Sequence, residues 1–150
     1  TGGFRERKRS LYEGGVRVPG LMVWPSRIPK GSSTSIPCST SDYFPTVLDI
    51  CGQGQDESKR PIDGVSIQGV FDGTMKERPA PIGFASGKNM TSLKTALIDN
   101  RYKYINGELY DLVDDPYEKK NIIGKHPDVA KEMKTTLETW LASCRQSENM

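Results

Sequence analysis

The sequence predicts an α/β fold that ends in a small α+β subdomain, an antiparallel sheet with a packed C-terminal helix. A short continuous apolar run at residues 21–24 is typical of a strand that is buried on both faces in a parallel sheet. Apolar segments after residue 92 are separated by turn signals, and Asn106-Gly107 among them favours an antiparallel hairpin. An apolar stripe at helical spacing near the end of the chain indicates a helix that lies on this sheet.

The chain opens with a basic, glycine-containing segment. Its basic side chains are Arg5, Arg7, Lys8 and Arg9. Gly14-Gly15 follow, and paired glycines favour loop conformations. The apolar run at 21–24 comes next, bounded by proline on both sides, and residues 25–40 are rich in Pro, Ser, Thr and Gly. We therefore expect a loop, a buried strand and a second loop.

A helix is expected to begin near Ser41, whose hydroxyl can accept a hydrogen bond from a free N–H group of the first turn. Asp42 suits the positive end of a helix, and Pro45 is tolerated in the first turn. Spacings of i, i+3, i+4 and i+7 predict one buried face, formed by Phe44, Val47, Leu48 and Cys51. The helix is expected to end at Gly52.

A subdomain boundary is expected where the composition shifts, near residues 72–82, because glycine and prolines interrupt the pattern there. We therefore divide the chain into residues 1–75, the end of the α/β domain, and residues 76–150, the small subdomain.

Three strands are expected in the second part, at residues 93–98, 102–105 and 108–112. Side chains alternate along a strand, so the two tyrosines of the middle strand should share a face. Asn106-Gly107 both tolerate positive φ, and a tight hairpin is therefore predicted between the second and third strands.

The last element is a helix that begins at Pro127, a residue that fits the first helical position. Asp128 follows in the first turn, where a negative charge is favoured. The apolar stripe of this helix consists of Val129, Met133, Leu137, Trp140 and Cys144. We interpret the whole stripe as core packing against the sheet.

The bulk composition excludes several classes of protein. The 150 residues are 35% hydrophobic and 27% charged, which suits one domain or two small ones and is unlike a disordered chain. A net charge of +2 does not indicate binding to nucleic acid, and no apolar run approaches the ~20 residues that a membrane span needs. The chain begins with Thr1, which is neither a start methionine nor a signal peptide, so we expect a cut inside a longer protein.

Residue types alone identify little chemistry. The basic segment would ordinarily be a solvated loop. Three cysteines without a Cys-x-x-Cys pair favour neither a disulfide scaffold nor a zinc site. The acidic residues after the hairpin are Asp111, Asp114, Asp115 and Glu118. They lack the spacing and the glycine of an EF-hand, so a polar turn is the better interpretation than a calcium loop.

Four segments, in order, resemble the formylglycine-dependent sulfatases. Residues 8–19, Lys-Arg-Ser-Leu-Tyr-Glu-Gly-Gly-Val-Arg-Val-Pro, followed by Trp24-Pro25, are similar to a lysine and a Tyr-Glu-Gly-Gly-Val-Arg-x-Pro segment of that family. Residues 41–52 resemble its Asp-x-x-Pro-Thr helix, and residues 63–66 its Asp-Gly turn. Residues 108–122 are similar to its C-terminal signature. The resemblance is closest to arylsulfatases and to sulfatases of sulfated sugars, such as N-acetylgalactosamine-6-sulfatase.

This resemblance implies the C-terminal part of a sulfuric ester hydrolase: the end of an alkaline-phosphatase-like catalytic domain at 1–75, followed by the subdomain at 76–150. Such enzymes hydrolyse aryl or sugar sulfates through a formylglycine, made from Cys or Ser in a Cys/Ser-x-Pro-x-Arg motif, and a divalent cation such as calcium. None of Cys38, Cys51 and Cys144 stands in that motif, and the family's metal ligands lie upstream of the matched segments. This chain alone is therefore expected to be inactive.

Lys8 is the one position that the resemblance carries over to the active site, as a catalytic and substrate-binding residue. A fixed lysine ammonium stabilises the charge that builds on sulfate oxygens during transfer. Glu13 and Arg17 are expected to form an ion pair that holds the same loop. The implied partners are a sulfated small molecule or sulfated carbohydrate and the N-terminal catalytic part of the protein, and the implied location is extracytoplasmic: periplasmic, secreted or lysosomal.

Two alternatives stay open at this point: a non-catalytic binding or interaction module derived from the fold, and a phosphodiesterase or phosphonate hydrolase of the same superfold. Residues 85–89 are a candidate pocket loop. The segments present do not identify the sulfate ester, because family members select substrates through pocket loops that are mostly absent here. A Cys/Ser-x-Pro-x-Arg segment upstream would distinguish the sulfatase from both alternatives.

Overall fold

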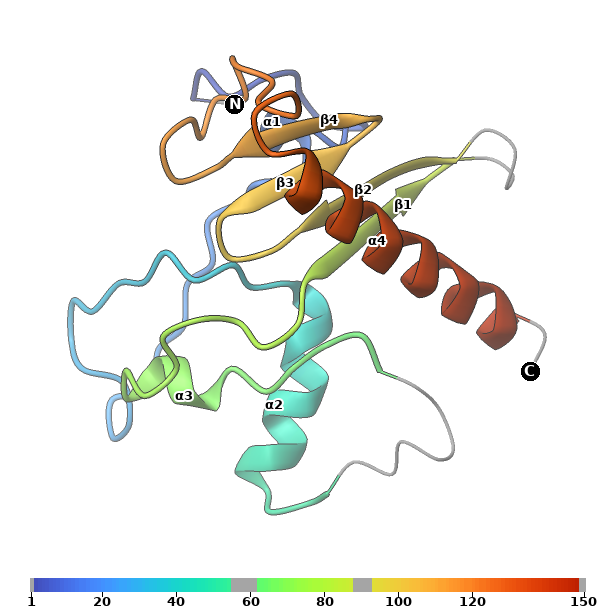
Figure 1. The fold of residues 1–150 in the computed structure, drawn as a ribbon. Coiled ribbons are helices and arrows are strands. Elements are labelled where there is room, and N and C mark those ends of the chain that lie inside the picture. The colour runs from blue at the N-terminus through green and yellow to red at the C-terminus, as the bar shows by residue number, and fades with distance from the viewer. Residues whose placement is uncertain (1, 55–61, 88–92, 149–150) are drawn as a thin grey trace. The chain divides into compact units, whose positions relative to one another are not determined.

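The computed structural model of the chain describes residues 2–54, 62–87 and 93–148 (Figure 1). Contacts divide the chain into two compact units: Thr1–Pro19 with Gly83–Met150 form the first, and Gly20–Ile82 form the second. The division at residue 75 that the sequence suggests therefore separates the first 19 residues from the part of the chain with which they pack.

A four-stranded sheet with the order β1-β2-β3-β4 is the centre of the first unit. Its strands are β1 (Ile82–Ser86), β2 (Lys94–Ile98), β3 (Tyr102–Ile105) and β4 (Glu108–Asp111). The pairs β2–β3 and β3–β4 are antiparallel, and Asn106 and Gly107 turn the hairpin with φ of 50° and 79°. The predicted sheet and hairpin are confirmed, whereas β1 was missed. Residues 85 and 86 belong to β1, and residues 88 and 89 of the candidate pocket loop lie outside the described residues.

The helix α4 (Pro127–Glu148) covers one face of this sheet (Figure 1). Its buried side chains Ala130, Met133 and Leu137 form a core with Leu97 of β2 and Leu109 of β4. The predicted helix and its central stripe are thus confirmed. β1 meets this helix through a glycine, because a Cβ on residue 83 would lie 2.5 Å from the indole ring of residue 140.

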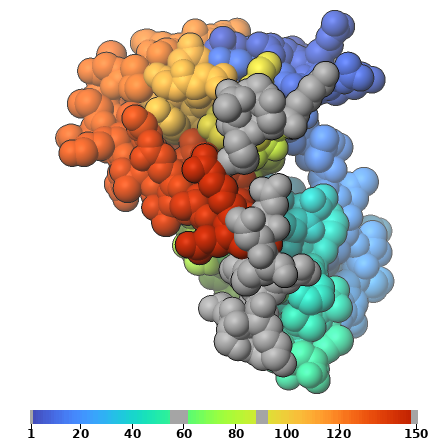
Figure 2. All heavy atoms as spheres, turned by 90° about the vertical axis from the view of Figure 1, so that its right-hand side faces the viewer, coloured from blue at the N-terminus to red at the C-terminus, as the bar shows by residue number. Residues whose placement is uncertain are grey.

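The opposite face of the sheet is covered by the start of the chain. Leu11 and Tyr12, directly before α1 (Glu13–Val16), pack against Ala96, Ile105 and Tyr110. Figure 2 shows the first residues, in dark blue, adjoining the strands of the sheet. Because side chains alternate along a strand, Lys103 of β3 lies on this same face, where its side chain is fully buried.

The second unit contains η1 (Thr40–Asp42), α2 (Tyr43–Ile50) and α3 (Gln68–Phe71). The predicted helix after residue 40 is confirmed, but its cap lies at Ser39, whose hydroxyl accepts from the Ser41 N–H group. Asp42 completes this capping box and is fully buried against Arg78, whose guanidinium donates to both carboxylate oxygens at 2.7 and 2.8 Å. Burial opposes ionisation of Asp42, yet the bonds from Arg78 and from backbone N–H groups outweigh it and lower its pKa.

The buried face predicted for α2 is wrong. Phe44 and Val47 are 58% and 56% exposed, and Cys51 is exposed as well. Pro45 and Thr46 are buried instead. The Thr46 hydroxyl accepts from a backbone N–H group of the segment before α3, and this packing, rather than apolar spacing, decides which side of the helix is covered.

The buried strand predicted at residues 21–24 is also wrong. Leu21 and Val23 are 94% and 86% exposed, and residues 20–24 adopt no strand. A strand needs neighbours for its N–H and C=O groups, and in the described part of the chain the four strands of the sheet pair only with one another. Trp24 is only partly exposed, and its ring lies edge-on to that of Phe71, with the ring centres 6.1 Å apart.

Candidate functional site

Lys8, the residue that the sequence resemblance singles out, lies in an exposed turn of the first unit. The turn is closed by the Ser10 N–H group, which donates to the Arg7 carbonyl at 3.0 Å. Arg9 in this turn has a φ of 75°, the left-handed region that few residues other than glycine adopt. The ammonium group of Lys8 is therefore carried at the surface on a tightly wound backbone.

The glycine pair Gly14-Gly15 lies directly under this turn. A Cβ on Gly14 would lie 2.3 Å from the Glu6 carbonyl oxygen, and one on Gly15 would lie 2.1 Å from the Ser10 carbonyl oxygen. The Gly14 N–H group also donates to the Arg5 carbonyl at 2.8 Å. The sequence predicted a loop at these glycines, but both lie in α1, and the structure shows that close approach of two backbone segments requires them.

Arg5 anchors the start of the same segment. Its Nη1 donates to the Tyr110 hydroxyl at 2.6 Å and to the Glu118 carbonyl at 3.2 Å. The guanidinium carbon also lies 3.8 Å from the centre of the Tyr12 ring, a cation–π contact. The expectation of a wholly solvated basic loop is therefore wrong for Arg5, although Arg7, Lys8 and Arg9 are exposed.

Glu108 of β4 accepts hydrogen bonds from two tyrosine hydroxyls. Tyr12 and Tyr110 both donate to its Oε2, at 2.6 and 2.8 Å. The bond from Tyr12 holds the pKa of Glu108 below its ordinary value, with help from Tyr110 and Arg5 and against the effect of burial. Burial, and then the bond to Glu108, raise the pKa of Tyr12 to about 12.

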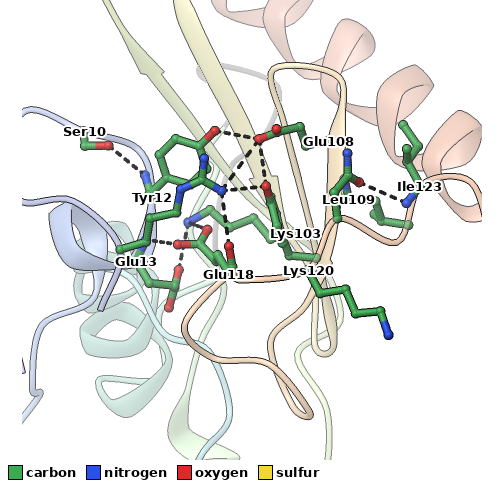
Figure 3. A network of polar contacts seen from close by, with 12 residues as sticks. Ser10, Tyr12, Glu13, Lys103, Glu108, Leu109, Glu118, Lys120 and Ile123 are labelled. Atoms are coloured by element: carbon green, nitrogen blue, oxygen red, sulfur yellow. Dashed lines mark hydrogen bonds and ion pairs between the residues drawn. The ribbon is translucent and has the colours of Figure 1, made fainter. Parts of the chain in front are cut away.

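A buried ion cluster lies beside these tyrosines (Figure 3). Lys103 Nζ lies 2.9 Å from Glu13 Oε1 and 2.9 Å from Glu118 Oε1, and Glu118 Oε2 accepts from the Glu13 N–H group at 2.6 Å. Arg17 approaches the other oxygen of Glu13 at 3.6 Å, so the expected Glu13–Arg17 pair is present. Burial raises the pKa of Glu118, against the opposing bonds from Glu13 and Lys103.

Sequence reasoning missed this cluster, although one signal was available. Lys103 lies between two tyrosines in β3, and strand alternation places it on the same buried face as Ile105. A lysine on a buried face needs a carboxylate partner there. The identity of that partner was not readable, because Glu13 and Glu118 reach the cation from distant segments.

The acidic residues after the hairpin are engaged within the protein. Asp111 and Asp114 both pair with Arg101, at 2.6 and 2.7 Å, and Glu118 pairs with Lys103. Within residues 2–54, 62–87 and 93–148, no group of three or more His, Cys, Asp or Glu side chains could hold a metal ion. The polar-turn interpretation agrees with these contacts.

Comparison with known proteins gives a consistent picture. The sequence model of the family described as N-sulphoglucosamine sulphohydrolase, C-terminal, matches residues 3–146. A sulfatase of Formosa agariphila is 30% identical over 91% of this chain and 29% of its own length. An N-acetylgalactosamine-6-O-sulfatase of Bacteroides thetaiotaomicron is 25% identical over 91% of this chain and 29% of its own length.

Solved structures agree with the sequence relatives. The crystal structure of a protein named Ps i-CgsB superposes with a TM-score of 0.81 at 25% identity, covering 91% of this chain and 31% of that protein. A second structure of Ps i-CgsB holds k-i-k-neocarrahexaose and matches with a TM-score of 0.75 at 26% identity, over 86% of this chain and 30% of that one. The chain thus spans less than a third of the length of the relatives it matches.

Proposed function

We propose that this chain, which belongs to the family of C-terminal domains of N-sulphoglucosamine sulphohydrolase, is the C-terminal part of a sulfatase that hydrolyses sulfate esters. The observation that carries this proposal is the match of residues 3–146, nearly the whole chain, to that family. The relative that is 30% identical over 91% of the chain supports it.

In this proposal Lys8 is the residue of the chain that acts on the sulfate group. Its ammonium is exposed, and its backbone is held in place by the Gly14-Gly15 contact and by the Arg5 anchor. A preorganised cation beside the sulfate stabilises negative charge as the ester bond breaks, without reorganisation at that moment. Lysine suits this role as a compact point charge.

The nucleophile and the cation of the proposed enzyme are assigned, from the sequence resemblance, to the part of the protein outside this chain. Formylglycine and a divalent cation such as calcium are the expected groups. The acidic side chains after the hairpin do not fit a cation site, because Asp111 and Asp114 pair with Arg101 and Glu118 pairs with Lys103. The contribution of the chain is therefore the positioning of Lys8.

A sulfated carbohydrate is the substrate class that we favour. Two similar proteins support this choice: one is named for an N-acetylgalactosamine-6-O-sulfatase activity, and the other has been solved with a neocarrahexaose bound. Aryl sulfates remain useful test substrates, since other similar proteins carry the name arylsulfatase. For the location of the enzyme we propose the periplasm, the lysosome or the exterior of the cell. Among the described residues, none of the helices combines the length and the apolar character that crossing a membrane requires.

The exposed side of α2 is the surface that we propose for contact with the N-terminal catalytic part of the same enzyme. Tyr43, Phe44 and Val47 are each more than half exposed and lie on one short helix. Apolar side chains grouped in this way mark an interaction surface. The chain spans only 29% of the related sulfatase, so the catalytic part of such an enzyme is the natural partner.

The test is an assay of the enzyme that carries this chain, using an aryl sulfate, a sulfated carbohydrate and a phosphate diester with the same aryl leaving group. Turnover of the sulfate esters supports the proposal. Turnover of the phosphate diester alone would instead identify a phosphodiesterase, and binding of the carbohydrate without any turnover would identify a binding module. The 150-residue chain by itself is expected to give no turnover above a buffer blank.

A further inference from the structure

The buried cluster of Lys103, Glu13 and Glu118 is not explained by stability alone. The side chains of Lys103 and Glu118 are fully buried and that of Glu13 is 5% exposed. Taking such charges out of water costs much of what their attraction returns, and apolar side chains of similar volume often stabilise a fold as well. The raised pKa of Glu118 agrees, because its surroundings disfavour the ionised form on balance. A better explanation for the presence of the cluster is that it fixes the positions of the chain segments that it joins.

Glu118 holds both ends of the segment that carries Lys8. Its carboxylate accepts from the Glu13 N–H group at 2.6 Å, and its carbonyl accepts from Arg5 Nη1 at 3.2 Å. Lys8 lies between these two attachment points, Arg5 and Glu13, in the sequence. Glu118 itself adopts a φ of 53°, a conformation that costs free energy for a residue other than glycine and that the surrounding contacts must maintain.

Lys103 fixes the carboxylate end of this arrangement. Its ammonium lies 2.9 Å from one oxygen of Glu118 and 2.9 Å from one oxygen of Glu13, so it sets the distance between the two carboxylates. Without the cation the two carboxylates would repel each other, and the bond between Glu118 and the Glu13 N–H group would be lost or lengthened. The backbone at the start of α1, on which the Lys8 turn is packed, would then shift.

We propose that Lys103 and Glu118 are positioning residues, which hold the 5–13 segment so that the Lys8 ammonium stands at a fixed place in the active site. This inference rests on the proposed catalytic role of Lys8. Neither residue is proposed to touch the substrate, since both are buried beneath the segment. A small displacement of a catalytic group is sufficient to lower the rate of the chemical step strongly.

The experiment is a kinetic double-mutant cycle in the whole enzyme, with Lys103→Met and Lys8→Ala made singly and together. Lys103→Met should lower kcat by about 10²-fold, with a smaller change in KM, when Lys8 is present. In the Lys8→Ala enzyme the same change should lower kcat far less, because the group it positions is already gone. Glu118→Gln, which keeps the shape of the side chain, should behave in the same way and serves if Lys103→Met does not fold.

Met133→Ala is the matched control, because it removes a buried side chain on the opposite face of the same sheet. It should lower the melting temperature and leave kcat unchanged. Equal losses of kcat from Lys103→Met in both backgrounds, or a similar loss in Met133→Ala, would refute the positioning role and leave the role of Lys8 intact. If instead Lys8→Ala itself keeps normal turnover, the proposed catalytic role of Lys8 fails, and the positioning inference fails with it.

Discussion

Lys103 and Glu13 form a buried ion pair between residues 90 positions apart, with Lys103 Nζ 2.9 Å from Glu13 Oε1. The pair joins strand β3 to the first turn of α1, and Glu118 completes it from the loop before α4. The start of the chain is thereby tied to the C-terminal sheet by charge as well as by apolar packing.

Removal of the cation should be costly. Lys103→Ala leaves two buried carboxylates without their partner and should lower the free energy of unfolding by about 3–5 kcal/mol. Lys134→Ala is the control, because Lys134 pairs with Glu138 at 3.8 Å on the exposed side of α4, and it should cost less than about 1 kcal/mol. Urea unfolding followed by circular dichroism measures both. Equal effects of the two changes would mean that the buried cluster does not hold the fold.

Arg5 should matter for folding more than its basic neighbours. Arg5→Ala removes the bond to the Tyr110 hydroxyl and the contact with the Tyr12 ring, and it should lower the free energy of unfolding by about 1–3 kcal/mol. Arg7→Ala, in the exposed turn, should change it by no more than about 0.5 kcal/mol. Thermal melts of the two variants compare them directly, and an Arg7 variant that is the less stable of the two would contradict the anchor.

Gly15→Ala should damage the turn that carries Lys8. The new Cβ would lie 2.1 Å from the Ser10 carbonyl oxygen, so one backbone segment must move, at a cost of about 1–3 kcal/mol. Gly124→Ala is the matched control, because nothing lies within 4 Å of a Cβ there, and it should be neutral or stabilise by up to about 1 kcal/mol. Calorimetry measures the stability of both variants. A Gly15 variant as stable as the parent would show that a glycine is not required at this close approach.

The Tyr12–Glu108 hydrogen bond predicts a dependence of stability on pH at both extremes. Tyr12 has a folded pKa of about 12, above its ordinary 10.0, so its stabilisation is complete below pH 10 and is lost as the pH rises toward 12. The folded pKa of Glu108 lies below its ordinary 4.5, so its stabilisation is present above pH 4.5 and is lost as the pH falls further.

Tyr12→Phe should therefore weaken the dependence at both ends, because it removes the titrating phenol and the main hydrogen bond to Glu108. Melting temperatures of the parent and the variant, measured from about pH 3 to about pH 11, show this directly. Parallel curves for the two proteins would be inconsistent with the assigned bond.

The elements that were predictable from the sequence are those whose signals are local. The Asn106-Gly107 turn requires positive φ at both residues, and the stripe from Met133 to Leu137 repeats at helical spacing over one face, so the hairpin and α4 follow from short stretches. β1 carries no such signal: it is short, contains a glycine at residue 83, and depends on the indole ring of α4 that packs over it.

The failures share a different cause, which is that burial depends on partners. Val23 and Phe44 stand in patterns that would be buried if neighbouring elements covered them, yet both are exposed. Arg5 and Lys103 show the reverse, since each is a basic residue that finds its partners in segments far along the chain. The role of Lys8 follows from its place in a family motif and stays a prediction, since Lys8, in its exposed turn, has no buried partner among the described residues that would mark it out.

Steady-state kinetics of Lys8→Ala in the whole enzyme test the proposed catalytic role of Lys8. We expect kcat for a sulfate ester to fall by about 10²–10³-fold, the scale for loss of one preorganised charge, while the melting temperature stays that of the parent. Arg7→Ala and Arg9→Ala should change kcat much less, because these side chains are exposed in the same turn without an assigned role. Near-normal turnover of Lys8→Ala, together with a collapse of turnover in either arginine variant, would contradict the claim.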